Sequence, residues 1–160
     1  MPPTITGDII TDAVVNLKAA LDTQRVTWGV SEVFPYPAHE VGTRGNAIAI
    51  EVAPSWIPKL EELASPVVHI SHKVALRIWY ITNIIRVEKA FEDIYSKLSK
   101  IVIYLIEHPS PNGYGELLID DQGFGPTVEP ITGVESEAGQ LLAGKFTLIH
   151  TYFKAHTQTL

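Results

Sequence analysis

The feature of the sequence that most constrains the fold is a long amphipathic segment in its middle. Apolar residues recur there at intervals of three and four: Val87, Ala90, Phe91, Ile94, Leu98, Ile101, Val102 and Leu105. This spacing predicts an α-helix with one apolar face, and Asn83 is expected to cap its start. About twenty residues at ~1.5 Å each make a rod of ~30 Å. A rod of that length can lie across a whole small sheet.

The sheet is predicted from segments in which apolar and polar residues alternate. The clearest runs from residue 67 to 81, where Val74, Leu76 and Ile78 fall on one face. Further strands are expected at residues 26–34, 47–52, 115–120, 127–132 and 145–153. Pro130 restricts the strand at 127–132 to a sheet edge, because proline has no backbone N–H to donate.

Segments rich in proline and glycine separate these strands. Residues 35–46 and 131–144 are predicted to be long connections. Residues 54–66, which begin and end with proline, are predicted to be a mostly irregular excursion. Loops of this length are uncommon in a compact domain unless they have a function, so we expect the two long connections to become ordered against partners.

A second amphipathic pattern predicts a helix over residues 8–22, with Asp8 or Thr6 as its N-terminal cap. The expected order of elements is α, β, β, β, α, β, β, β. Runs of strands without regular βαβ alternation indicate an α+β fold. We expect an antiparallel or mixed sheet of about five to six strands with two main helices packed on one face. The length fits a single domain over residues 1–160, with residues 154–160 expected to fray.

The composition is that of a globular protein, with 46% hydrophobic and 19% charged residues. A chain of this size buries enough surface to fold without disulfides or metal. The expected core consists of apolar positions from the strongest periodic segments. They are Leu17, Leu21, Val30, Ile50, Leu76, Ile78, Phe91, Ile94, Leu98 and Val102.

The charge balance argues against a nucleic-acid-binding protein. Lys and Arg number 12 against 18 Asp and Glu, which gives a net charge of −6, and the cations are dispersed along the chain. Binding to a phosphate backbone requires clustered cations that displace counterions, so no specific nucleic-acid partner is expected. No apolar run is long enough to cross a bilayer, and the N-terminus has no signal-peptide pattern. No membrane partner is therefore expected.

No residue pattern predicts catalysis, a cofactor or a metal. The chain has no cysteine. His69 and His72 would point to opposite faces of a strand, so one ion could not easily take both. The adjacent carboxylates Glu61–Glu62 and Asp120–Asp121 fit turn chemistry and solvation better than general acid–base catalysis. The sequence contains no phosphate-binding glycine loop and no nucleophile elbow. We expect a protein that is not an enzyme.

The long helix carries its charges on two sides. The basic residues cluster in one stripe and two acidic residues lie on the other flank of the apolar face: Arg86, Lys89, Lys97 and Lys100, against Glu88 and Glu92. One interpretation is a pair of solvated helix edges. The other is a subunit interface, because two different and complementary patches suit head-to-tail contacts between identical chains.

The order of elements resembles that of the tail-terminator (tail completion) proteins of long-tailed bacteriophages. The resemblance is architectural and covers most of the chain. It rests on ITDAVVNLKAAL, VTWGVSEVF followed by PYPAHE, AIAIEV, HKVALRIWYI, VEKAFEDIYSKLSKIVIYL and GKFTLIHTYFK. Residues 54–66 have no counterpart in the family pattern. The family has no catalytic motif, so no catalytic residue is carried over.

The resemblance implies a structural virion protein, made in the host cytoplasm and located at the tail–neck junction. Such a protein forms a ring, usually of six copies, that ends the tail tube and joins it to the neck or connector protein. DNA would pass through the ring without being bound specifically. Two alternatives stay open beside it: another neck or head-closure ring protein, or a small ligand-binding or enzymatic α+β domain. A cellular homo-oligomeric adaptor also fits the residues, but not the family likeness.

Overall fold

Six strands form one mixed sheet in the computed structural model, which describes residues 2–41, 45–119, 127–136 and 139–159. The strand order is β1-β2-β3-β6-β4, and β5 also pairs with β6. β1 is parallel to β2, and the other described pairings are antiparallel. The elements are α1 (Ile9–Asp22), β1 (Glu32–Phe34), η1 (Ala38–Glu40), β2 (Ala47–Ala64), β3 (Val67–Ile81), α2 (Val87–Glu107), η2 (Pro111–Gly113), β4 (Glu116–Ile119), β5 (Thr127–Ser136) and β6 (Gly139–Thr157). The α+β prediction is confirmed.

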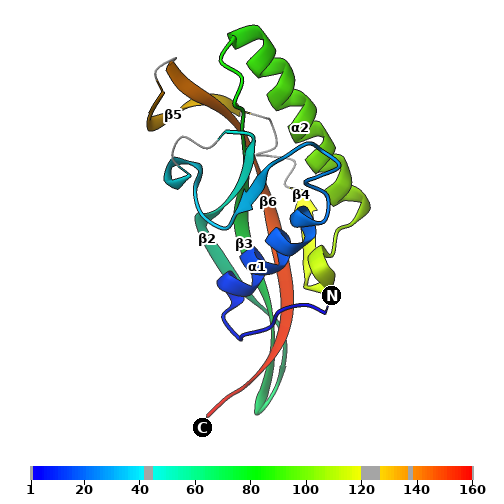
Figure 1. Cartoon of the computed structure of the whole chain (residues 1–160). Helices are drawn as coiled ribbons and strands as arrows, with labels where there is room; N and C mark the ends of the chain where they lie inside the picture. The colour runs from blue at the N-terminus through cyan, green and yellow to red at the C-terminus, as the bar shows by residue number, and fades with distance from the viewer. Residues whose placement is uncertain (1, 42–44, 120–126, 137–138, 160) are drawn as a thin grey trace.

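Both main helices lie on the same face of the sheet, as the sequence predicted (Figure 1). The alternating residues Val74, Leu76, Ile78 and Tyr80 of β3 are fully buried beneath them. Leu17 and Leu21 come down from α1, and Ile94, Leu98 and Ile101 from α2. Burial of each such side chain contributes roughly 1.5–3 kcal/mol. This shared apolar layer joins the two helices and the sheet into one core.

α2 packs very closely on β6, and Gly144 makes the approach possible. A Cβ at that position would lie 2.7 Å from Leu98 Cδ1 and closer still to Ile94 Cγ2. Contacts that short force neighbouring atoms to move. A residue without a side chain is therefore required where the long helix crosses the sheet.

The reverse face of the sheet is covered along only part of its length. A second apolar cluster lies there, built from Phe34, Ala38, Val41, Ala47, Ala49, Trp79, Ile81, Ile131, Leu141 and Ala143. These residues come from η1 and its flanks, from the first part of β2 and the last part of β3, and from the β5–β6 hairpin. At this end the sheet is thus buried on both faces.

The predicted core is largely correct. Eight of its ten residues are buried, and Phe91 and Val102 are only partly buried. Both exceptions lie at one margin of the apolar face of α2, so the sheet covers them only in part. The expected cap of the first helix is also correct, since Asp8 accepts a hydrogen bond from Thr11 N at 3.2 Å. Asn83 does not cap α2; Arg86 occupies that position without a side-chain cap bond.

Two predictions about strands and connections are wrong, one near the start of the sheet and one between β5 and β6. Residues 26–34 were expected to be one strand, but only Glu32–Phe34 is extended. Gly29 has a φ of +71°, and Val30 N bonds to Arg25 O at 2.7 Å, so the chain turns there. Residues 131–144 are not a long connection, because β5 and β6 form a hairpin in which Glu135 pairs with Gln140. The residues from 131 to 144 became strand because β5 and β6 pair with each other, and the sequence of a single segment does not reveal such a pairing.

Residues 54–66 are not an irregular excursion. β2 continues through them as far as Ala64, and its register with β3 shifts between Val52 and Trp56 and between Leu60 and Glu62. Pro54 and Pro58 are tolerated because β1 pairs only with residues 47–49, which leaves this stretch of β2 as an edge strand. The fraying expected from residue 154 is also wrong for residues 154–157, which pair with β3 as far as Thr157 opposite Val67.

Candidate functional site

Beyond the helices, β2, β3 and β6 continue together as a three-stranded arm. We define the arm as residues 54–64, 67–73 and 151–157. It projects from the lower end of the molecule in Figure 1, beside the C-terminus. Five of its large apolar side chains are 48% to 64% exposed: Trp56, Ile57, Leu60, Leu63 and Phe153. Large apolar patches exposed on a monomeric protein commonly mark a surface that binds something.

The two faces of the arm differ. Cross-strand partners lie on one face of a sheet, and Trp56 pairs with Val74, Leu60 with Ile70 and Leu63 with Val68. Val74 belongs to the face that the helices cover, so Trp56, Leu60 and Leu63 continue that face outward. His72, Lys154 and His156 lie on the same face. We call these six residues the arm face; Ile57 and Phe153 lie on the reverse face.

A chain of hydrogen bonds crosses the arm face from strand to strand. Trp56 Nε1 lies 3.2 Å from His72 Nδ1, and His72 Nε2 lies 2.8 Å from His156 Nε2. The indole N–H can only donate, so His72 Nδ1 accepts and the proton of neutral His72 is on Nε2. That proton is donated to His156, whose own proton is then on Nδ1. The chain therefore ends in a donor, the His156 Nδ1–H.

The surroundings of His72 lower the pKa of its imidazole. Burial is the main cause that lowers its pKa, and the charges of His156 and Lys154 lower it further. A second proton on His72 would sit on Nδ1 and remove the acceptor for Trp56. The hydrogen bond from Trp56 therefore uses His72 with an unprotonated Nδ1, and Lys154 is the lysine of the arm face.

The charged residues of α2 that were expected at an interface mostly pair with each other. Arg86 lies 3.7 Å from Glu88, and Lys89 lies 3.0 Å from Glu92. Both pairs are more than half exposed, and exposed pairs contribute only about 0–1 kcal/mol. Lys97 is bound more firmly, 3.0 Å from Asp93 with both side chains 15% exposed. Of the basic stripe, Lys100 alone has no ion pair among the described residues. Most of the basic stripe thus forms ion pairs within its own subunit.

The other flank of α2 carries an apolar surface. Phe91, Tyr95, Val102 and Ile106 recur at intervals that place them on one side of the helix. Tyr95 is 47% and Ile106 is 58% exposed, and the Phe91 and Tyr95 rings contact each other at 5.8 Å. Glu88 and Glu92 border this row. We call the four apolar residues and the two carboxylates the α2 flank.

A polar cluster joins α2 to the sheet. Asp93 Oδ2 accepts from Tyr80 Oη at 2.7 Å and from Thr82 Oγ1 at 2.8 Å, and Asp93 Oδ1 accepts from Lys97 Nζ at 3.0 Å. Burial would raise the pKa of Asp93, but the hydrogen bonds from Tyr80, Lys97 and Thr82 outweigh it and lower the pKa. Burial and the bond to Asp93 raise the pKa of Tyr80. These partners satisfy one another, so the cluster is a structural tie between helix and strand.

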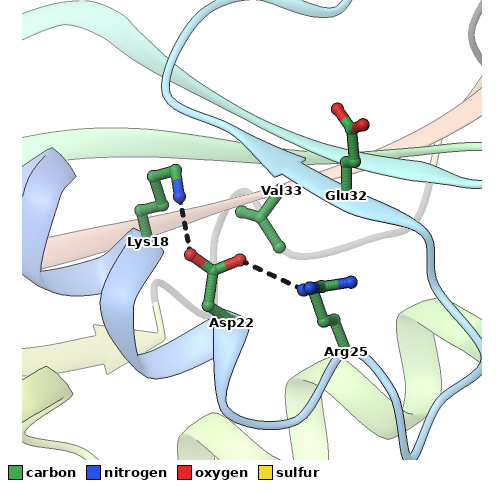
Figure 2. A pocket seen from close by; sticks show the side chains of 5 residues that line it. All are labelled: Lys18, Asp22, Arg25, Glu32 and Val33. Atoms are coloured by element: carbon green, nitrogen blue, oxygen red, sulfur yellow. Dashed lines mark hydrogen bonds and ion pairs between the residues drawn. The ribbon is translucent and has the colours of Figure 1, made fainter.

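A hollow with a volume of ≈ 470 Å³ lies between the end of α1 and β1 (Figure 2). Asp22 lies at its centre, 2.6 Å from Lys18 and 3.7 Å from Arg25. Arg25 also donates to Ser31 O at 2.6 Å. Glu32 and Val33 complete the lining. Asp22 thus pairs with both cations, and Arg25 is also bound to the backbone, so these charges are engaged within the chain.

The sequence candidates for metal or acid–base chemistry do not come together. His69 and His72 lie on opposite faces of β3, as expected, and the described residues contain no group of three or more metal-ligating side chains. Glu61 and Glu62 are exposed on the arm, and Lys59 lies 3.6 Å from Glu61. Asp120 and Asp121 lie outside the described residues.

No protein-family model matches the chain, and no curated protein sequence matches it either. Within the part of the chain that the structure describes, no helix is long and apolar enough to span a membrane.

The arm is the surface that the sequence did not predict. The prolines in residues 54–66 led to the prediction of an irregular segment. Apolar residues at positions 56, 57, 60 and 63 indicate that the stretch is not an ordinary polar loop. The α2 flank was also overlooked, because Phe91 and Val102 were assigned to the core on spacing alone.

Proposed function

We propose that this protein is a structural subunit of a virus particle that closes into a ring, ends the tail tube and joins the tail to the neck. The proposal combines the resemblance to the tail-terminator proteins of long-tailed bacteriophages with the surfaces described above. The subunit acts by binding copies of itself and neighbouring virion proteins. It carries out no chemical step.

The arm is the observation that carries the proposal. It exposes five large apolar side chains on strands that extend beyond the helices. A subunit that must remain folded alone and then bind other subunits needs such a surface, since apolar contacts supply most of the affinity of a protein interface. An enzyme or a small-ligand carrier would instead need an enclosed pocket with convergent polar groups.

The separation of exposed surfaces favours a ring over a two-fold dimer. The arm and the α2 flank differ in shape and composition, and they belong to different parts of the molecule (Figure 1). Contacts between two unlike surfaces are heterologous, and they close into a ring when the rotation between subunits permits. A terminator needs closure, because an open head-to-tail contact would continue as a filament.

The charge of the chain suits a passage for DNA. A net charge of −6 with dispersed cations gives little affinity for phosphate backbones. DNA could then slide through the ring without being held. Sub-micromolar, salt-sensitive binding of duplex DNA by the isolated protein would contradict this part of the proposal.

Co-purification tests the function directly. The tagged full chain is expressed with the tail-tube protein of the same virus, and in parallel with its portal or adaptor protein. We expect capture of tail tubes, and electron microscopy of assembled tails should show a closed ring, expected to be of six copies, at the tail–neck junction. Capture of the portal or adaptor alone would indicate a head-closure protein instead. A strict two-fold dimer on the particle, or no density at the junction, would refute the proposal.

A further inference from the structure

We propose that the arm of one subunit binds the α2 flank of the next, with the arm face turned toward the helix. This inference rests on the proposed function, because it names the two surfaces that would make the ring contact. The partner that binds the arm face is a second copy of this chain. Four observations lead to it: the position, length, chemistry and strand edges of the two surfaces.

The two surfaces cannot satisfy each other within one subunit. The arm projects from the end of the sheet opposite to the start of α2, and it points away from that helix (Figure 1). Any contact between arm and α2 flank must therefore join two subunits. The contact would be head-to-tail, since each subunit would give its arm to one neighbour and its helix to the other.

The lengths of the two surfaces match. At about 3.3 Å per residue, residues 54–64 extend over roughly 35 Å. The 21 residues of α2 extend over roughly 30 Å. A helix lying along a three-stranded sheet is also the packing that this chain already uses inside its own core, where α2 crosses β3 and β6. The proposed contact repeats it between subunits.

The chemistry of the two surfaces is complementary. The arm face presents Trp56, Leu60 and Leu63 on β2, and the cation Lys154 lies level with Leu60 on β6, across β3. The α2 flank presents Phe91, Tyr95, Val102 and Ile106 next to Glu88 and Glu92. Apolar side chains can thus meet apolar side chains while a cation meets carboxylates. The His156 Nδ1–H, left as a donor at the end of the Trp56–His72–His156 chain, offers those carboxylates a further hydrogen bond.

The outer edge of the arm is unsuited to the commonest alternative, strand addition. The free edge of β2 contains Pro54 and Pro58, which lack the N–H groups that a neighbouring strand would need. An approach through the face of the arm avoids this obstacle, because it uses side chains and leaves the backbone edges unpaired.

Cysteine cross-linking tests the contact cleanly, because the chain has no cysteine of its own. Leu60→Cys places a thiol on the arm face and Tyr95→Cys places one on the α2 flank. The two full-length single variants are mixed at concentrations where native mass spectrometry detects oligomers, or on tail tubes, and oxidised gently. We expect a disulfide between unlike subunits, and the double variant should give a ladder that ends at a closed ring.

Two matched controls define the surfaces. Ile57→Cys is as exposed as Leu60→Cys and lies on the same strand, but on the reverse face of the arm. Lys100→Cys lies on α2 in the basic stripe, away from the α2 flank. Neither should form a disulfide with the partner thiol at more than a tenth of the rate of the Leu60–Tyr95 pair. Equal rates with either control would overturn the assignment.

Charge exchange supplies a second measurement. Lys154→Glu and Glu92→Lys should each slow formation of the Leu60–Tyr95 disulfide by up to about fivefold, as expected for an exposed ion pair, and the double exchange should restore it. If the cysteine variants form oligomers but no disulfide between Cys at position 60 and Cys at position 95, this contact is refuted and the proposed ring is not. Absence of any oligomer, alone or on tail tubes, would refute the proposed function and this inference with it.

Discussion

The two halves of the central strands have the same backbone pairing and opposite surroundings. In the half under the helices, Val74, Leu76, Ile78 and Tyr80 of β3 are fully buried. In the arm, the same pairing of β2, β3 and β6 continues, but Trp56, Leu60 and Phe153 are about half exposed or more. Antiparallel hydrogen bonding therefore sets how far the strands extend, and the helices decide only which part becomes core.

Each half also contains one buried histidine among the described residues. His150 is fully buried, stacks on Tyr114 and bonds to Tyr114 O at 2.9 Å. His72 is buried at the base of the arm between Trp56 and His156. The core histidine is enclosed by the fold of one subunit, whereas the arm histidine organises an outward surface. The two buried histidines therefore lie in different surroundings, one enclosed by the helices and one beside an exposed surface.

Truncation in the covered half should have the largest effect. Leu98→Ala should lower the free energy of unfolding by about 2–5 kcal/mol, because Leu98 is 3% exposed and packs between α2 and β6. Ile103→Ala on the same helix is the control; Ile103 is 55% exposed, so a change within about 0.5 kcal/mol is expected. Urea unfolding measures both. Equal losses would show that α2 does not pack as described.

Loss of the tie between helix and sheet should come next. Asp93→Ala removes the acceptor of three hydrogen bonds from Tyr80, Thr82 and Lys97. It should lower the free energy of unfolding by roughly 2–3 kcal/mol, since hydrogen bonds to charged groups are among the stronger ones. Glu92→Ala, one residue away in an exposed ion pair, should change it by less than about 1 kcal/mol. Comparable effects would mean that the cluster is solvated.

Acidification should weaken both halves. Burial is the main cause that lowers the pKa of His150 and of His72 in the folded protein. The unfolded chain then binds more protons below its ordinary histidine pKa of about 6.5, so stability is complete above that pH and decreases as the pH falls toward the folded pKa values. The slope should reach up to about 1.4 kcal/mol per pH unit for each histidine.

Substitution can show how much each of the two histidines contributes to this pH dependence of the unfolding free energy. His150→Asn should flatten the pH dependence of the urea midpoint between pH 7 and 5 more than His72→Asn does, because His150 is the more deeply buried. A wild-type midpoint that does not change over this range would contradict the lowered pKa of both rings.

Truncation in the arm should have the smallest effect on folding. Leu60→Ser and Leu63→Ser should change the free energy of unfolding by less than about 0.5 kcal/mol, because both side chains are more than half exposed. The same variants should reduce self-association in analytical ultracentrifugation or native mass spectrometry. A loss of stability comparable to that of Leu98→Ala would remove the distinction between the two halves.

Hydrophobic spacing alone determined much of the architecture. The period near 3.6 identified α1 and α2, and Asp8 was identified as the cap of α1. The period of two identified β3 with both of its end residues correct. These signals are strong because one apolar face must be buried along the whole element. Ile94, Leu98, Leu76 and Ile78 could therefore be assigned to the core without a structure.

Tertiary structure decided what local sequence could not. Pro54 and Pro58 interrupt a strand pattern, and only the position of β2 at the sheet edge made a continuous strand possible through them. The same holds for residues 154–157, which are ordered by pairing with β3, more than 80 positions earlier in the chain. Phe91 and Val102 fit the helical period, but the width of the sheet beneath α2 left them at its margin. Spacing states which side of an element is apolar. The length and edges of the neighbouring elements decide how much of that side is covered, and so where apolar surface stays exposed.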